Sequence, residues 1–517
     1  MENIYSLIKC LTSSEWESFR NYLTCFSTHE SSEVKYLKLS DFLRKSEDCP
    51  SQKRCSYVIY GAYDKTSIEK LKSRLKEKAL DFLLTDISFD KQQELDEGDL
   101  AIIKIKKKSA QFQQLYYSKK RIPNLLHCML DEIIALAKQF EQYSNLVEHL
   151  RLKKALVSWK KGKTEFEEIE FEIEFYNECG RLVNKAEHSY YELIMLGEFS
   201  GRNNKEKLDT FFIRSVEELD GYYQKTKSPL IKYHLKFLEL GYYQHKENFL
   251  KSRSICLELL DIVRNNKSVY RRQRVGVVYD NLSRCEYYLS HFKQAAEWAR
   301  EAQKHFNTGS ENFCIALEQE FYALFSIGQY DQAVIIANKM INSASRKELG
   351  EFRYAKYNVL LANALFKLRR FNEALNLLSQ EMEISKDKAG WETGKRILKI
   401  MTLIEMLKLD EASLAVMSLK QFFKYNDKKG MTISARDKKI LNLLLVAERA
   451  GFLFSILNGN TEKHMHPLRS DDMNLRWEPF THEVIPFHAW FAGKMKVNLN
   501  SIPKLVKAEK IKMAVLK

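Results

Sequence analysis

The sequence predicts an all-α fold, an α-solenoid of stacked antiparallel helix pairs with a helical N-terminal module and an irregular C-terminal cap. In three segments an aromatic residue precedes an alanine by three positions: Phe292 and Ala295, Tyr330 and Ala333, and Phe371 and Ala374. Successive alanines are about 40 residues apart, which is near the period of a repeated helix pair. Only 7 Pro and 18 Gly occur in 517 residues, and this composition favours long helices over turn-rich sheet.

Residues 1–120 are predicted to form the N-terminal helical module. Thr12-Ser-Ser-Glu15 fits a capping box, in which the hydroxyl and the carboxylate accept hydrogen bonds from free amides at a helix start. A second box, Thr66-Ser-Ile-Glu69, is predicted to begin a helix with one apolar face and one basic face.

Residues 121–204 are predicted to form long helices with degenerate repeats. A basic stretch over 151–163 is followed by the acidic stretch 165–174, with Gly162 between them at a predicted helix end. We interpret the two stretches as helices that fold back on one another with complementary charge. The alternation of glutamate and apolar residues over 165–174 also fits a strand, but glutamate favours a helix.

Residues 205–459 are predicted to form the solenoid itself. One small residue marks the same position in each repeat: Ser252, Ala295, Ala333, Ala374 and Ala412. Two helices approach closely where one of them contributes a small side chain, so these positions are expected to be buried.

Residues 460–517 are predicted to form a C-terminal capping segment and a basic tail. Four of the seven prolines lie here, at Pro467, Pro479, Pro486 and Pro503. A terminal repeat needs its open apolar side covered, and an irregular segment suits that role. Residues 504–517 fit a basic amphipathic helix or a frayed tail.

The charge and cysteine content restrict the surroundings of the chain. The net charge of +15 is compatible with nucleic acid, an anionic membrane surface or acidic protein partners, and also with solubility alone. Nine cysteines without close pairs indicate reduced core residues rather than a disulfide set. The N-terminus has no basic region followed by an apolar run, and no spanning segment is expected, so the predicted location is cytoplasmic.

No motif in the sequence predicts catalysis or a cofactor. Gly-x-Ser-x-Gly and His-Glu-x-x-His are both absent from the sequence. Gly162-Lys163-Thr164 lacks the earlier glycine of a phosphate-binding loop, because Val157 stands in its place. His464 and His466 have no cysteine or carboxylate pattern beside them, so we expect no metal site. The protein is expected to be no enzyme.

Over about 230–420 the sequence resembles the tetratricopeptide repeat (TPR) family. Three matches carry the resemblance: Leu282-Ser283 with Phe292, Ala295, Ala299 and Ala302; Gly328 with Tyr330, Ala333 and Ala337; and Leu361-Ala362 with Leu365, Phe371 and Ala374. The proline that ends a typical repeat is missing, since Asn307 and Ser345 stand at the equivalent places. The overall layout also looks like that of long bacterial TPR-type proteins.

The resemblance implies a concave groove lined by the first helix of each pair. The implied groove residues are Phe237, His245, Arg284, Tyr287, Tyr288, Tyr322, Phe325, Lys356, Asn363 and Lys367. Aromatic rings with interspersed cations and amides suit a peptide, because the rings give rigid apolar contact while the polar groups bind carboxylates or backbone.

Two functions are carried forward as hypotheses. The first is a non-catalytic scaffold that binds a peptide or a partner domain in this groove. The alternative is a bacterial regulator or defence-system component that binds nucleic acid through basic N-terminal helices, with the repeats as a sensor or docking domain. Its candidate contact residues are Lys70, Arg74, Lys78, Lys104, Lys106, Lys107 and Lys108. The basic stretches also fit solvated helix faces.

Overall fold

In the computed structural model every regular element of the described residues is a helix, so the all-α prediction is confirmed. The description covers 1–25, 30–85, 95–117, 122–157, 163–199, 205–343, 350–380, 390–430, 433–457, 459–470, 472 and 475–496. The predicted tail, Gly162 and the boundary at 120 lie outside these ranges. None of the helices within them is both long enough and apolar enough to cross a membrane.

The helices of the first part of the chain are α1 (Glu2–Cys10), α2 (Ser13–Cys25), α3 (Glu30–Lys45), α4 (Gln52–Tyr60), α5 (Lys65–Thr85), α6 (Glu97–Tyr117), α7 (Pro123–Gln139), α8 (Tyr143–Val157) and α9 (Lys163–Phe199). Those that follow are α10 (Lys205–Thr226), α11 (Pro229–His245), α12 (Phe249–Asn265), α13 (Arg272–Tyr288), α14 (Phe292–Gln303), α15 (Glu311–Ser326), α16 (Tyr330–Asn342), α18 (Glu351–Lys367), α19 (Phe371–Ser379), α20 (Trp391–Glu405), α21 (Leu409–Lys428), α22 (Ala435–Arg449), α23 (Gly459–Met465) and α24 (Phe487–Lys496). Short 3₁₀ turns, η3 (Phe454–Ile456) and η4 (His466–Arg469), flank α23.

The chain divides into two compact units. One contains 1–183 with 267–271, and the other contains 184–266 with 272–517. In the first unit, Ile4, Phe19 and Leu75 belong to one apolar core, and Phe112 and Leu130 belong to another. The predicted boundary at 204 falls outside the described residues and the one after 459 falls within α23, so the four-part division stays a prediction.

The two predicted capping boxes have different outcomes. At the start of α2, the Thr12 amide donates to Glu15 Oε2 at 2.7 Å and the Glu15 amide donates to Thr12 Oγ1 at 3.3 Å, which confirms the first box. The second box is wrong, because α5 begins at Lys65 and Asp64 caps it by accepting from the Ser67 amide at 3.0 Å. Aspartate is as good a cap as threonine, and it lies two residues earlier.

The predicted charge complementarity of 151–174 is confirmed, and the acidic stretch is helical. It lies within α9, a helix of 37 residues. Lys154 on α8 forms an ion pair with Glu170 on α9, and Lys138 on α7 bonds Glu172 at 2.8 Å. The helix interpretation is correct: glutamate is a good helix former, and Glu170 and Glu172 pair with lysines of neighbouring helices.

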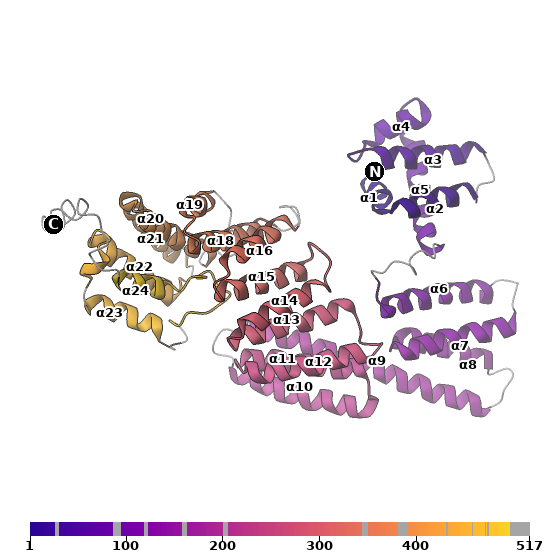
Figure 1. Cartoon of the computed structure of the whole chain (residues 1–517). Coiled ribbons are helices and arrows are strands. Elements are labelled where there is room, and N and C mark those ends of the chain that lie inside the picture. The colour runs from indigo at the N-terminus through magenta and orange to yellow at the C-terminus, as the bar shows by residue number, and fades with distance from the viewer. Residues whose placement is uncertain are drawn as a thin grey trace. The chain divides into compact units, whose positions relative to one another are not determined.

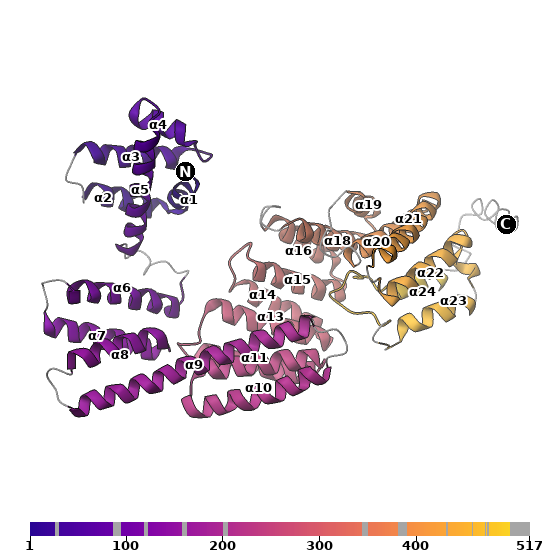
Figure 2. The same cartoon turned by 180° about the vertical axis from the view of Figure 1, so that it is seen from behind.

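From α10 to α22 the helices follow one another side by side, as Figures 1 and 2 show from opposite directions. The five small marker residues are all 0% exposed, which confirms the predicted repeat register: Ser252, Ala295, Ala333, Ala374 and Ala412. The aromatic residue at the start of the second helix packs edge-on against a ring five positions earlier in three repeats. These ring pairs are Tyr287 with Phe292, Phe325 with Tyr330, and Phe366 with Phe371.

The turn within each helix pair repeats as well, although its residue types differ from one pair to the next. The residue two before the second helix has positive φ in five repeats: Glu247, Ser290, Gly328, Arg369 and Leu407. The backbone amide of Ser290 donates to the Tyr287 carbonyl and that of His291 donates to the Glu286 carbonyl, both at 2.9 Å. These two bonds form a Schellman motif at the end of the first helix. Only Gly328 carries the expected residue type, so the other turns escape a search for glycine.

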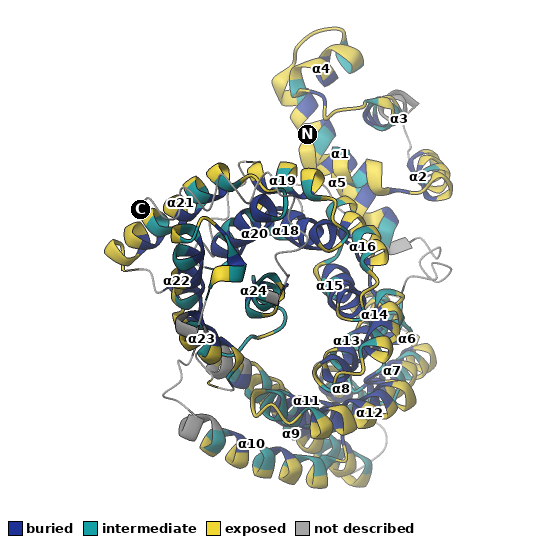
Figure 3. Cartoon of the chain, turned by 60° about the vertical axis from the view of Figure 1, so that its left-hand side comes forward, coloured by how far each residue is buried: buried dark blue, intermediate teal, exposed yellow. Residues whose placement is uncertain are grey.

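The first helices of the pairs lie on the inner side of the curved second unit. Figure 3 shows α11, α13, α15, α18, α20 and α22 inside, and α12, α14, α16, α19 and α21 outside. α24 lies on the inner side, enclosed by the first helices. The segment that contains α24 therefore lies against the inner face of the array.

Candidate functional site

The candidate site is a cluster of three tyrosines on the inner face of the second unit. Tyr287 and Tyr288 end α13, and Tyr322 lies on α15. The Tyr287 hydroxyl bonds Ser326 Oγ at 2.9 Å, and the Tyr288 ring stacks on Phe249 with centroids 4.1 Å apart. Burial raises the pKa of all three phenols, so they remain neutral. We call these residues the tyrosine cluster.

The tyrosine cluster holds a phenylalanine, Phe480, from the irregular segment that precedes α24. The Phe480 ring centroid lies 4.7 Å from those of Tyr287 and Tyr322, and 5.8 Å from that of Tyr288. Edge-to-face and tilted rings at these distances attract one another beyond the effect of buried area. Phe480 belongs to 475–483, an irregular segment that we call the strap.

A second side chain of the strap binds the array through charge. The Arg476 guanidinium forms a two-point ion pair with Glu247, and its Nη1 lies 3.0 Å from Oε2. Glu247 lies in the turn between α11 and α12. The bonds to Glu247 are the first cause of the raised pKa of Arg476. Arg476 and Phe480 together are named the contact pair.

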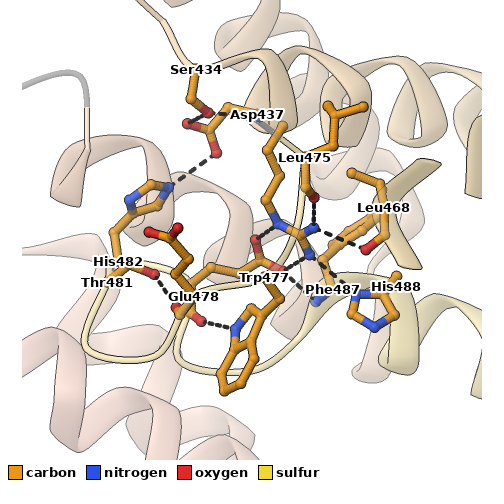
Figure 4. A network of polar contacts seen from close by, with 12 residues as sticks. Ser434, Asp437, Leu468, Leu475, Trp477, Glu478, Thr481, His482, Phe487 and His488 are labelled. Carbon is orange, nitrogen blue, oxygen red and sulfur yellow. Dashed lines mark hydrogen bonds and ion pairs between the residues drawn. The ribbon is translucent and has the colours of Figure 1, made fainter. Parts of the chain in front are cut away.

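The two ends of the strap are fixed at a different place, around Arg436 in the first turn of α22 (Figure 4). The Arg436 guanidinium forms a two-point ion pair with Glu483 and donates to the carbonyls of Leu475 and Leu468. The strap crosses back on itself, since Trp477 Nε1 donates to the Glu483 carbonyl at 2.7 Å. This set of contacts is named the base.

Histidines complete the base. His482 Nε2 lies 3.0 Å from Asp437 Oδ1, and Ser434 Oγ donates to the other oxygen of Asp437 at 2.7 Å. Arg436 Nη2 donates to His488 Nδ1 at 3.1 Å, which requires a neutral imidazole. Burial, and then the Arg436 charge, lower the pKa of His488. His482 and His488 thus bond protein groups, and the described residues contain no cluster arranged to hold a metal ion.

The base is also pressed against α20. A Cβ built on Gly394 would lie 2.5 Å from the His482 carbonyl oxygen, so only glycine allows this approach. Beyond the strap, Trp490 Nε1 donates to Glu405 Oε1 at 2.8 Å and Lys494 Nζ lies 2.7 Å from Glu405 Oε2. These contacts place α24 on the last helix pairs and align the strap with the inner face.

The implied groove residues fall into three groups. Tyr287, Tyr288 and Tyr322 are brought together at Phe480, and the exposed Arg284 lies one turn before Tyr288 on α13. Phe237, Phe325 and Asn363 are buried in helix packing: Phe237 against Tyr190 and Tyr233, Phe325 against Tyr330, and Asn363 by a bond to the Val359 carbonyl. Successive residues of an α-helix point about 100° apart, so neighbouring positions on one helix can face the inner surface or the helix packing.

The remaining three implied groove residues lie away from the tyrosine cluster. His245 is exposed at the end of α11. Lys356 pairs with Glu318 and lies over the Trp391 ring, and Lys367 lies over the Tyr330 ring at 5.6 Å. The structure therefore concentrates the candidate site on α13, α15 and the turn between α11 and α12.

The candidate nucleic-acid contacts of the N-terminal half lie on two helices, α5 and α6. Lys70 and Arg74 are exposed on α5, whereas Lys78 is half-buried over the Tyr36 ring. On α6, Lys104 and Lys106 are exposed, Lys107 is half-buried, and Lys108 forms an ion pair with Glu132. Part of this charge is thus balanced within the protein.

The functional residues that sequence reasoning missed are Arg476, Phe480, Glu247 and Arg436. Their one sequence signal is the cluster Arg476-Trp-Glu-Pro-Phe480, in which bulky and charged residues stand in an otherwise irregular segment. In the array, buried positions recur with the helix period and can be predicted from the sequence. The strap has no such periodicity, so its contacts cannot be predicted in this way.

Comparisons with known proteins give structural likenesses only. No family model and no curated protein matches the sequence. The apo form of RapI is similar with a TM-score of 0.45 at 13% identity, over 72% of this chain and 88% of RapI. A STAND signal-transduction ATPase with a tetratricopeptide repeat sensor, from Pyrococcus horikoshii, is similar with a TM-score of 0.38 at 10% identity, over 83% of this chain and 65% of that protein. The function is therefore inferred from the contacts of this chain.

Proposed function

We propose that the protein is a non-catalytic scaffold that binds a peptide or an irregular segment of a partner protein on the inner face, at α13, α15 and the turn between α11 and α12. One observation carries this proposal: the tyrosine cluster already accommodates a side chain from an irregular segment, Phe480. Aromatic residues and arginine are the side chains that most often dominate binding energy at protein interfaces. Both types meet at this face.

The test uses two side chains that lie at the site without filling the core. Arg284 and Tyr288 are both exposed on α13, and Tyr288 retains 39% of its surface. The double variant Arg284→Glu/Tyr288→Ala of the full chain is expected to lose its protein partners in quantitative affinity capture from the native host. Circular dichroism is expected to show unchanged helicity.

The matched control is Lys293→Glu/Gln294→Ala on α14, where both side chains are exposed on an outer helix. This control is expected to recover the same partners as the parent protein. Equal partner recovery by the two double variants would remove the inner face from consideration as the binding surface.

The nucleic-acid alternative remains a hypothesis that the contacts favour less. Lys108 is paired with Glu132, and Lys78 covers a ring. Phosphate binding depends on clustered cations that release counterions, and a paired lysine contributes little to that release. A gel shift at low salt with the full chain tests this alternative directly.

A further inference from the structure

The strap contacts α13, α15 and the turn after α11 through one cation and one ring. Arg476 reaches Glu247 at the turn after α11, and Phe480 reaches rings on α13 and α15. The two side chains are four residues apart, and Pro479 between them restricts the backbone. The contact pair thus binds the array at two separate points, one through an ion pair and the other through ring packing.

The base holds the strap independently of the contact pair. Its main contacts join Arg436 to Glu483, Leu475 and Leu468, and Trp477 to the Glu483 carbonyl. None of these bonds involves the side chain of Arg476 or Phe480. The contact pair can therefore leave the inner face while both ends of the strap remain fixed.

Three features show that the strap satisfies the site incompletely. Tyr322 is only 3% exposed, and its hydroxyl is buried without a hydrogen-bond partner in the structure. An unpaired buried hydroxyl costs free energy that a better occupant recovers. Phe480 adopts φ of +61°, which is unfavourable for a bulky side chain, and the Arg476–Glu247 pair is partly open to water.

We propose that the contact pair is a built-in competitor that mimics the partner of this site. The partner segment carries a cation followed by an aromatic residue at the spacing of Arg476 and Phe480. It displaces these two side chains from Glu247 and the tyrosine cluster and leaves the base closed. This inference rests on the proposed function and specifies both the partner's chemistry and the regulation of the site.

The strap sets a threshold for binding because it is tethered. A segment held near its site competes at an effective concentration of about 1 mM. If the strap segment itself has a Kd of about 100 µM for the open site, the closed form outweighs the open form about tenfold, and the apparent affinity for a partner peptide falls about tenfold. Any event that frees the contact pair raises the affinity of the site by the same factor.

The experiment measures binding of a synthetic peptide to the full chain by fluorescence anisotropy. The probe is a labelled peptide with the sequence of Leu475 to Glu483, and the control peptide has alanine in place of both Arg476 and Phe480. The proteins compared are the parent chain, Arg476→Ala/Phe480→Ala, and Thr481→Ala. The last is the matched control, because Thr481 Oγ1 bonds only the Glu478 carbonyl of the strap in the structure.

Arg476→Ala/Phe480→Ala is expected to bind the probe about tenfold more tightly than the parent or Thr481→Ala, and to bind the control peptide weakly. Adding Glu247→Lys to the released protein is expected to abolish probe binding. The single variant Arg476→Ala, whose side chain is partly exposed, gives a smaller gain in the same direction if the double variant folds poorly. Equal probe affinity for the parent and released proteins would overturn the inference, as would equal binding of probe and control peptide.

The two proposals fail in different ways. If the released protein binds the probe, but Arg284→Glu/Tyr288→Ala added to it leaves partner recovery unchanged, the scaffold function fails. The mimicry of a partner fails with it, and only the occupation of the site by the contact pair stands. If that addition removes the partners while the probe does not bind, the competitor fails and the scaffold stands.

Discussion

The base and the contact pair both hold the same nine-residue strap, but their ion pairs differ in exposure to water. At the base, the side chains of Arg436 and Glu483 are 9% and 7% exposed. At the contact pair, those of Arg476 and Glu247 are 29% and 48% exposed. Removing one partner of a buried ion pair leaves the other charge buried without a partner. In an exposed pair, water solvates the charge that remains. The strap therefore has a fixed anchor and an exchangeable contact.

The largest expected effect comes from Arg436→Ala. This change leaves the Glu483 carboxylate buried without its cation and two carbonyls without a donor, so the C-terminal cap loses about 3–5 kcal/mol. Hydrogen exchange over α22 and α24 measures the loss, because repeat arrays open locally. The double change Arg436→Met/Glu483→Leu is expected to recover part of it. A loss no greater than that of Arg476→Ala would contradict the comparison.

Gly394→Ala is the second test of the base. The new Cβ would lie 2.5 Å from the His482 carbonyl oxygen, which is backbone and yields little, so overpacking is expected to cost about 1–3 kcal/mol. Gly221→Ala on α10 is the control, since nothing lies within 4 Å of its Cβ. The control is expected to gain roughly 0.5–1 kcal/mol from helix propensity. Thermal unfolding in which the two variants match would refute the close approach of the base to α20.

A smaller effect is expected from pH. The pKa of His488 is lowered in the folded protein, so below about pH 6.5 the unfolded chain binds a proton that the folded base excludes. The stability contributed by neutral His488 is present above this pH and is lost as the pH falls. His488→Gln is expected to reduce the loss of exchange protection of α24 between pH 7.5 and 5.5, both chosen to bracket about 6.5. His245→Gln, at an exposed position, serves as the control.

The smallest effect on stability is expected from Arg476→Ala. The pair with Glu247 is partly exposed, so its removal is expected to cost about 0.2–1 kcal/mol. Added salt is expected to shrink the difference between variant and parent, because salt screens exposed charges. Denaturation of both proteins at low and high ionic strength measures this difference. A salt-independent loss would show that Arg476 acts through packing instead.

Sequence reasoning located one side of the site and missed the other. The resemblance to the tetratricopeptide repeat family implied a groove lined by the first helices, and Tyr287, Tyr288 and Tyr322 were among its predicted residues. Phe325 occupies the same repeat position as Tyr287, yet its ring packs against Tyr330 at the turn and against Phe321 on the same helix. The two residues differ in what lies opposite: Phe480 contacts Tyr287 from a segment almost two hundred residues later in the chain.

The sequence by itself determined that the described chain is helical, and it determined which small residues lie at the helix crossings. Those properties depend on neighbours within a helix pair, and a period of about 40 residues displays them. Only the tertiary structure decided which inner-face side chains meet the strap and which charges are buried at its base. Contacts between an irregular segment and distant helices follow no repeat, so they emerge only when the array folds and its last segment packs against it.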